Sequence, residues 1–93
     1  MTIMSKDFIK DPNAQKQYTL DGFTNYLAGA TFTSKSWSVP AGITLIASDI
    51  DITNQYLLVT LSGGTLGTDY DCYVTFTTSD GRTDRAMLRM KIR

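Results

Sequence analysis

The sequence predicts an all-β protein folded as a two-sheet sandwich of six or seven short antiparallel strands. Residues 69–78 and 83–92 alternate polar and apolar side chains with the period of two that a half-buried strand requires. Glycine, proline and aspartate clusters separate the other apolar stretches at short intervals, and no stretch sustains a helical period. Many short strands divided by turns are typical of a sandwich or a barrel.

The expected organisation is an extended N-terminal arm over residues 1–13, followed by one domain over residues 14–93. The chain is too short for a second domain. Residues 23–30 are expected to form a loop or a short helical turn, and residues 49–54 a connection that could carry a further strand. The expected strands cover residues 15–20, 31–39, 43–48, 55–61, 69–78 and 83–92.

The arm carries apolar side chains that a purely solvated tail would have little reason to hold. Ile3, Phe8 and Ile9 are therefore candidate contacts with a neighbouring copy or another protein. Two alternatives are open: a frayed terminus, or a segment in which Phe8 and Ile9 fold back over an open end of their own sandwich.

The last two strands offer a second candidate contact surface. Ser79-Asp80-Gly81 is a hairpin turn signal, so the strands on either side should be neighbours. Their alternation turns Tyr73, Arg85, Met87 and Arg89 outwards. Five of the nine basic residues fall within residues 82–93. This predicts either a basic stripe that meets an acidic partner or a charged, solvated edge, and the two are compatible.

One short motif favours an immunoglobulin-like form of the sandwich. Tyr70 lies two residues before Cys72, the spacing of the tyrosine corner, whose hydroxyl bonds to backbone a few residues upstream. Trp37 is a candidate for the bulky residue between the sheets. Cys72 has no cysteine partner in this chain, so it should be buried and unreactive. With no apparent signal peptide, this predicts folding in a reducing cytoplasm.

The side-chain inventory argues against catalysis and against a cofactor. The chain has no histidine and no glutamate, so a Ser-His-Asp or Cys-His arrangement and a Cys/His zinc site are excluded within it. Formal net charge is zero, which argues against nucleic acid or an anionic membrane surface as partner. No apolar run is long enough to predict a membrane-spanning helix.

Two stretches resemble ligand loops only in part. Residues 49–54 begin like a calcium loop, with oxygen-bearing side chains at alternate positions, but the glycine and the final acidic residue of an EF-hand are missing. Asp69 and Asp71 repeat the alternate spacing. Ser62 to Gly67 is glycine-rich but lacks the Gly-Lys-Ser/Thr ending of a phosphate loop. A strand or turn is the expected role of each.

Several stretches of the sequence match one family in order and at the expected spacing. They are Lys10-Asp11-Pro12-Asn13-Ala14, Tyr18-Thr19-Leu20-Asp21, Tyr26-Leu27, Ser36 to Thr44, Leu61 to Tyr70 and Thr77 to Asp84. With these stretches the chain resembles a family of small virion proteins of tailed bacteriophages and prophages, the fiber–tail adaptor or minor virion proteins. The resemblance implies an immunoglobulin-like structural protein present in several copies around a symmetric assembly, with no catalytic residues. The chain departs from the family where Gly22-Phe23 replaces an expected tryptophan.

The expected function is to connect tail or neck to fibers through protein–protein contacts. Two alternatives are a capsid decoration protein and a carbohydrate-binding module of a host-recognition apparatus. The second would need an exposed aromatic platform, for which Phe23, Tyr26 and Phe32 are the candidates. Assembly into a homo-oligomer would also stabilise a domain with so small a core.

Overall fold

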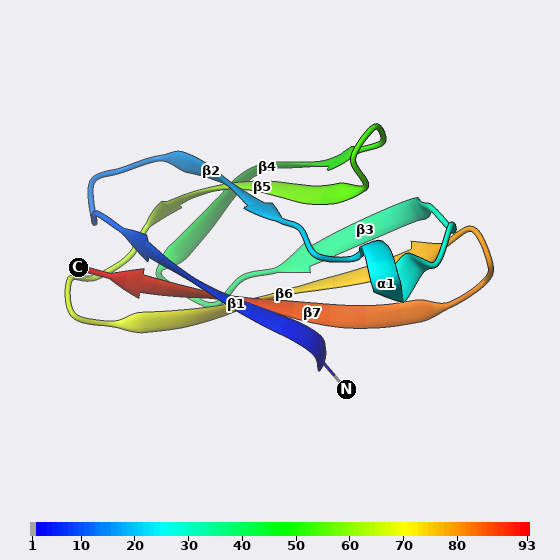
Figure 1. Ribbon diagram of the computed structural model, residues 1–93. Helices are drawn as coiled ribbons and strands as arrows, with labels where there is room; N and C mark the ends of the chain where they lie inside the picture. The colour runs from blue at the N-terminus through cyan, green and yellow to red at the C-terminus, as the bar shows by residue number, and fades with distance from the viewer. Residues whose placement is uncertain (1) are drawn as a thin grey trace.

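A computed structural model describes residues 2–93 and contains two β-sheets packed as a sandwich (Figure 1). The larger sheet has the order β1-β7-β6-β3 and the smaller sheet β2-β5-β4. The predicted all-β sandwich is confirmed. Its elements are β1 (Thr2–Lys10), β2 (Lys16–Leu20), α1 (Thr24–Leu27), β3 (Phe32–Ser38), β4 (Ile43–Asp51), β5 (Tyr56–Gly63), β6 (Asp69–Thr78) and β7 (Thr83–Ile92).

The core forms where the inward-facing side chains of the two sheets meet. The strands alternate as the sequence predicts, because successive side chains of a strand point to opposite faces. Phe23, Phe32 and Phe76 pack edge to face, with ring centroids 5.0–5.6 Å apart. The fully buried aliphatic residues include Leu20, Leu57, Val59, Leu61, Val74, Leu88, Met90 and Ile92.

The short helix α1 is held against the turn between β6 and β7. The Arg82 guanidinium donates to the carbonyls of Tyr26, at 2.8 Å, and Leu27, at 3.3 Å. It also lies 4.3 Å from the centre of the Tyr26 ring, within the range of a cation–π contact. The Tyr26 hydroxyl donates to the Asp84 carboxylate. The helical turn expected over residues 23–30 is therefore present.

The N-terminal segment differs from the expected arm. Residues Thr2–Lys10 form β1, which pairs in parallel with β7 and extends the larger sheet. The sequence did not predict this strand, because Lys6 and Lys10 occupy inward positions and interrupt the apolar alternation. Lys10 is only 2% exposed, and its Nζ donates to the carbonyls of Gly63, at 2.6 Å, and Asp11, at 2.8 Å.

Tyr70 and Cys72 lie as the immunoglobulin-like motif predicts. The Tyr70 hydroxyl accepts a hydrogen bond from the Thr65 backbone N–H at 3.0 Å, which ties the start of β6 to the turn before it. Cys72 is fully buried, and burial raises the pKa of its thiol to about 11. Trp37 packs, partly buried, against the core. The immunoglobulin-like assignment itself remains a prediction, which this hydrogen bond supports.

Candidate interaction surface

The outer face of the larger sheet brings together most of the predicted contact residues. Tyr73 on β6 lies directly opposite Met87 on β7, and both are half-buried. The Arg85 guanidinium lies 4.2 Å from the centre of the Tyr73 ring, so the aromatic ring and the cation form one unit. We call Tyr73, Arg85 and Met87 the outer-face cluster.

Serine and threonine side chains surround this cluster on the β3 side. Ser36 and Ser38 pair with Thr75 and Tyr73 across the β3–β6 ladder. Small hydroxyl side chains leave the sheet surface low there, so the larger side chains of the outer-face cluster stand above it. The face suits a flat contact with another protein better than the enclosure of a small molecule.

Aspartates pair with several of the cations that the sequence placed on this face. Arg89 forms an ion pair with Asp71, in which Nε lies 2.8 Å from the carboxylate oxygen. Lys91 pairs with Asp7 at 3.2 Å. The sequence could not show this neutralisation, since Asp7 reaches the face only through the parallel pairing of β1 with β7.

The third ion pair of this face lies at the end of the larger sheet. Arg93 approaches the Asp69 carboxylate at 3.0 Å.

The hydrogen bond from Arg89 lowers the pKa of Asp71, and the same bond raises the pKa of Arg89. The charges of Arg89 and Asp71 are therefore paired beside the outer-face cluster, whereas the Arg85 guanidinium lies over the Tyr73 ring.

The N-terminal candidates divide between the two faces of β1. Ile9 is 69% exposed and lies beside Lys91, on the same side of the sheet as the outer-face cluster. Phe8 points the other way and packs against Tyr18, with ring centroids 5.1 Å apart. Phe8 therefore folds back onto its own sandwich, as one of the alternatives from the sequence had it, whereas Ile9 does not. The side chain of Ile3 lies outside the described residues.

A second surface, which the sequence analysis missed, follows β4. This strand forms a free edge of the smaller sheet. Among the residues whose burial the structure describes, five large hydrophobic side chains are exposed, and three of them lie on β4 or in the turn after it: Leu45, Ile46 and Ile52. A register shift between Leu45 and Ala47 marks a β-bulge. The signal was present in the sequence as the uncharged run of residues 43–48, which was interpreted only as a strand.

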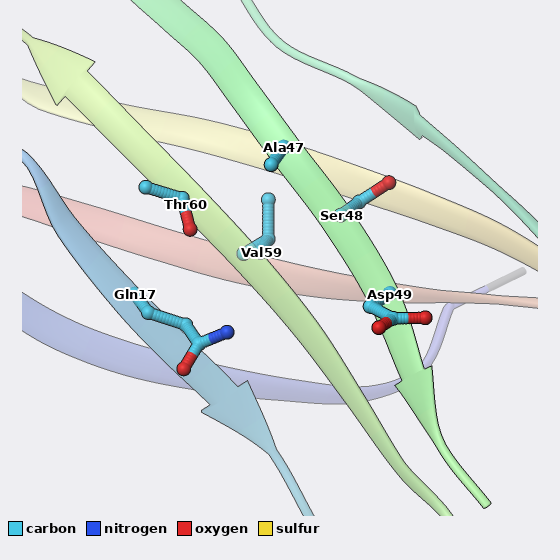
Figure 2. Close-up of a pocket in the computed structure, with 6 residues that line it drawn as sticks. All are labelled: Gln17, Ala47, Ser48, Asp49, Val59 and Thr60. Atoms are coloured by element: carbon cyan, nitrogen blue, oxygen red, sulfur yellow. The ribbon is translucent and has the colours of Figure 1, made fainter.

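A shallow depression crosses the outer face of the smaller sheet. Figure 2 shows Gln17 on β2, Thr60 on β5 and Ala47 on β4 across this depression, with Asp49 at one side.

The aspartates considered for calcium are used in other ways. The Asp51 carboxylate accepts hydrogen bonds from the backbone N–H groups of Thr53 and Asn54, which shapes the β4–β5 turn. Asp69 and Asp71 are held in the ion pairs with Arg93 and Arg89. Within residues 2–93, no group of three or more His, Cys, Asp or Glu side chains could hold a metal ion.

The aromatic platform expected of a carbohydrate-binding module does not form. Phe23 and Phe32 are 2% and 6% exposed and belong to the core. Tyr26 is half-buried, and its hydroxyl is engaged by Asp84. None of the helices among the described residues is long and apolar enough to cross a membrane.

Comparison with known families gives a match over most of the chain. Residues 10–91 match the family described as podophage GP4 fiber-tail adaptor protein gp77. The chain belongs to this family of fiber–tail adaptors. Adaptors of this family are structural proteins of bacteriophages, which places the chain in the virion and makes other virion proteins its partners. No curated protein matches the chain.

The family match agrees with the resemblance drawn from the sequence motifs. It begins at Lys10, the last residue of β1, and so covers both sheets except for most of that strand. Adaptors work by contact with other proteins. The outer-face cluster and the β4 edge are the surfaces of this chain whose side chains are suited to such contacts.

Proposed function

We propose that the chain joins the tail or neck of a tailed bacteriophage to its fibers through protein–protein contacts, without catalysing a reaction. The observation that carries this proposal is the match of residues 10–91 to the fiber–tail adaptor family. The absence of histidine and glutamate from the sequence supports a non-catalytic role.

The outer-face cluster is the proposed contact with the neighbouring virion protein. Tyrosine, methionine and arginine are enriched in protein interfaces, where a central apolar patch is surrounded by a polar rim. Tyr73, Met87 and Arg85 supply the centre here, and the Arg89–Asp71 ion pair supplies part of the rim. Ile9 extends the patch along β1.

The proposed setting is the assembled particle. The chain is made in the cytoplasm of the bacterial host, where the buried thiol of Cys72 stays reduced, and it then enters the virion in several copies. A symmetric assembly adds buried surface to a small domain. Neither nucleic acid nor a membrane is a proposed partner, which agrees with the zero net charge.

A phage that lacks this gene, complemented by plasmid-borne variants, tests the proposal. We expect particles without the protein to carry tails but no fibers when counted by electron microscopy. Met87→Asp should not restore fibers, because it puts a charge in the centre of the patch. Arg85 and Arg89 lie on the same side of β7 as residue 87, so the new aspartate should not destabilise the fold.

The matched control is Leu58→Lys on the outer face of the smaller sheet. Leu58 is a half-buried apolar residue of a central strand, as Met87 is, and it pairs with Asp49, which would neutralise the new lysine. This variant should restore fibers. Fibers on particles that lack the protein would refute the adaptor role. Loss of a capsid surface layer in place of fibers would support a decoration protein instead.

A further inference from the structure

One cation on the outer face of the larger sheet has no acidic partner among residues 2–93. The last three cations of the chain pair with aspartates at N–O distances of 2.8, 3.2 and 3.0 Å. Arg85 forms no ion pair, and its guanidinium lies over the Tyr73 ring, 4.2 Å from the ring centre. The cations of this face are Arg85, Arg89, Lys91 and Arg93, and its carboxylates are those of Asp7, Asp69 and Asp71. The surplus charge of the face therefore lies in the outer-face cluster.

The contact with Tyr73 holds the Arg85 side chain and leaves its donors available. A guanidinium carries five N–H donors in its plane, and an aromatic ring beside it covers only the flat face. The Arg85 side chain is exposed and makes no hydrogen bond within residues 2–93, whereas the guanidinium of Arg89 donates to both carboxylate oxygens of Asp71. Arg85 is therefore the cation of this face that can serve another molecule.

Hydroxyl side chains lie beside Arg85 on the β3 side. Thr75 is directly opposite Arg85 in the β6–β7 ladder, and Ser36 is opposite Thr75 in the β3–β6 ladder. A carboxylate that accepts two hydrogen bonds from a guanidinium keeps further acceptor positions, which hydroxyl groups can fill. This matters at an interface, because a buried charge is costly unless its hydrogen-bonding positions are filled. The neighbourhood of Arg85 therefore suits a carboxylate.

We propose that the neighbouring virion protein places an acidic side chain against the Arg85 guanidinium, with Tyr73 and Met87 as the apolar part of the contact. The inference rests on the proposed function, in which the outer-face cluster contacts that protein. It adds the chemistry of the partner residue and makes Arg85 the residue that determines specificity. Two parallel hydrogen bonds between guanidinium and carboxylate fix the orientation of the partner as well as its charge.

The charges around Arg85 favour a single carboxylate over a polyanion. Nucleic acid binds where several cations neutralise several phosphates. Here the other cations of the face are already paired, and their aspartate partners would repel further negative groups. The same face of a second copy could not supply the carboxylate either, since the carboxylates of this face are all used by its own cations. The partner is therefore a protein surface with an isolated acidic residue.

Charge reversal at Arg85 in the complemented phage tests the inference. Arg85→Glu should lower the fraction of particles with fibers at least about tenfold, because two carboxylates would then face each other. Arg85→Lys should restore fibers only in part, since an ammonium keeps the charge but lacks the planar fork. The matched control is Lys16→Glu, which should restore fibers: it makes the same charge change at an exposed lysine of the smaller sheet that has no acidic partner within residues 2–93. Circular dichroism of each purified variant should show an unchanged fold.

Second-site suppressors identify the partner residue. Phage that encode Arg85→Glu, selected on cells that lack the unmodified protein, should regain fibers when an acidic residue of a neighbouring virion protein changes to lysine or arginine. Suppressors at an aspartate of this chain would overturn the choice of partner. Fibers on particles with Arg85→Glu, where Met87→Asp removes them, would overturn the inference and leave the adaptor role in place. Fibers on particles without the protein would overturn both.

Discussion

Replacing Tyr70 by phenylalanine tests the tie between β6 and the turn that precedes it. The substitution keeps the ring and removes only the hydroxyl oxygen, which accepts the 3.0 Å hydrogen bond from the Thr65 N–H. One neutral hydrogen bond contributes roughly 0.5–1.5 kcal/mol net to the free energy of unfolding. The Thr65 N–H is near solvent and regains water as a partner, so the cost should lie near the lower half of that range, about 0.5–1 kcal/mol.

Urea denaturation, followed by circular dichroism at pH 7, measures this cost. Tyr73→Phe is the matched control: its hydroxyl has no hydrogen-bond partner within residues 2–93, and its ring stays beside Arg85. The urea midpoint should fall for Tyr70→Phe and should change little for Tyr73→Phe, with equal slopes for both. Equal midpoints for the two variants would refute a stabilising role for the Tyr70 bond.

Three further predictions concern the core, the ion pairs and the β5–β6 turn. Cys72 should not react with a thiol reagent at pH 8 until urea unfolds the protein, because the thiol is buried and its pKa is raised to about 11; rapid labelling of the native chain would contradict this. Because Arg89 lowers the pKa of Asp71 in the folded state, Asp71→Asn should lower the urea midpoint at pH 6. This difference should begin to shrink near pH 4, roughly the pKa of an unfolded aspartate, and should be lost as pH falls through the lowered pKa of the folded state, as midpoints measured across pH will show. A loss that is the same at every pH would exclude the ion pair as its cause. Gly64→Ala should cost at least about 2 kcal/mol in the same assay, because Gly64 has φ +102° and an added Cβ would lie 2.6 Å from the Ile92 side chain; a smaller loss would mean that this side chain can move aside.

The sequence pattern alone predicted the strands of the larger sheet, except for β1. Residues 69–78 and 83–92 alternate without interruption, so the boundaries of β6 and β7 were predicted correctly. The spacing of Tyr70 and Cys72 correctly predicted one hydrogen bond and one buried thiol. These features depend on neighbours in the sequence, which a local pattern can reveal.

The features that were missed depend on contacts between distant parts of the chain. β1 was not predicted, because Lys10 occupies an inward position, where its Nζ donates to the carbonyls of the distant Gly63 on β5 and of Asp11. The ion pair of Asp7 with Lys91 was missed for the same reason, since the two residues meet only after β1 has paired with β7. Ile46 is exposed because β4 is an edge strand. The alternation of side chains along a strand does not reveal the order of the strands in a sheet.

A reconstruction of the phage particle that resolves the junction of tail and fibers tests the adaptor assignment most directly. The account predicts that this chain lies between tail or neck proteins and the base of a fiber, with Tyr73 and Met87 covered by a neighbouring protein. A subunit found on the capsid surface, or one at the junction with this face open to solvent, would contradict it.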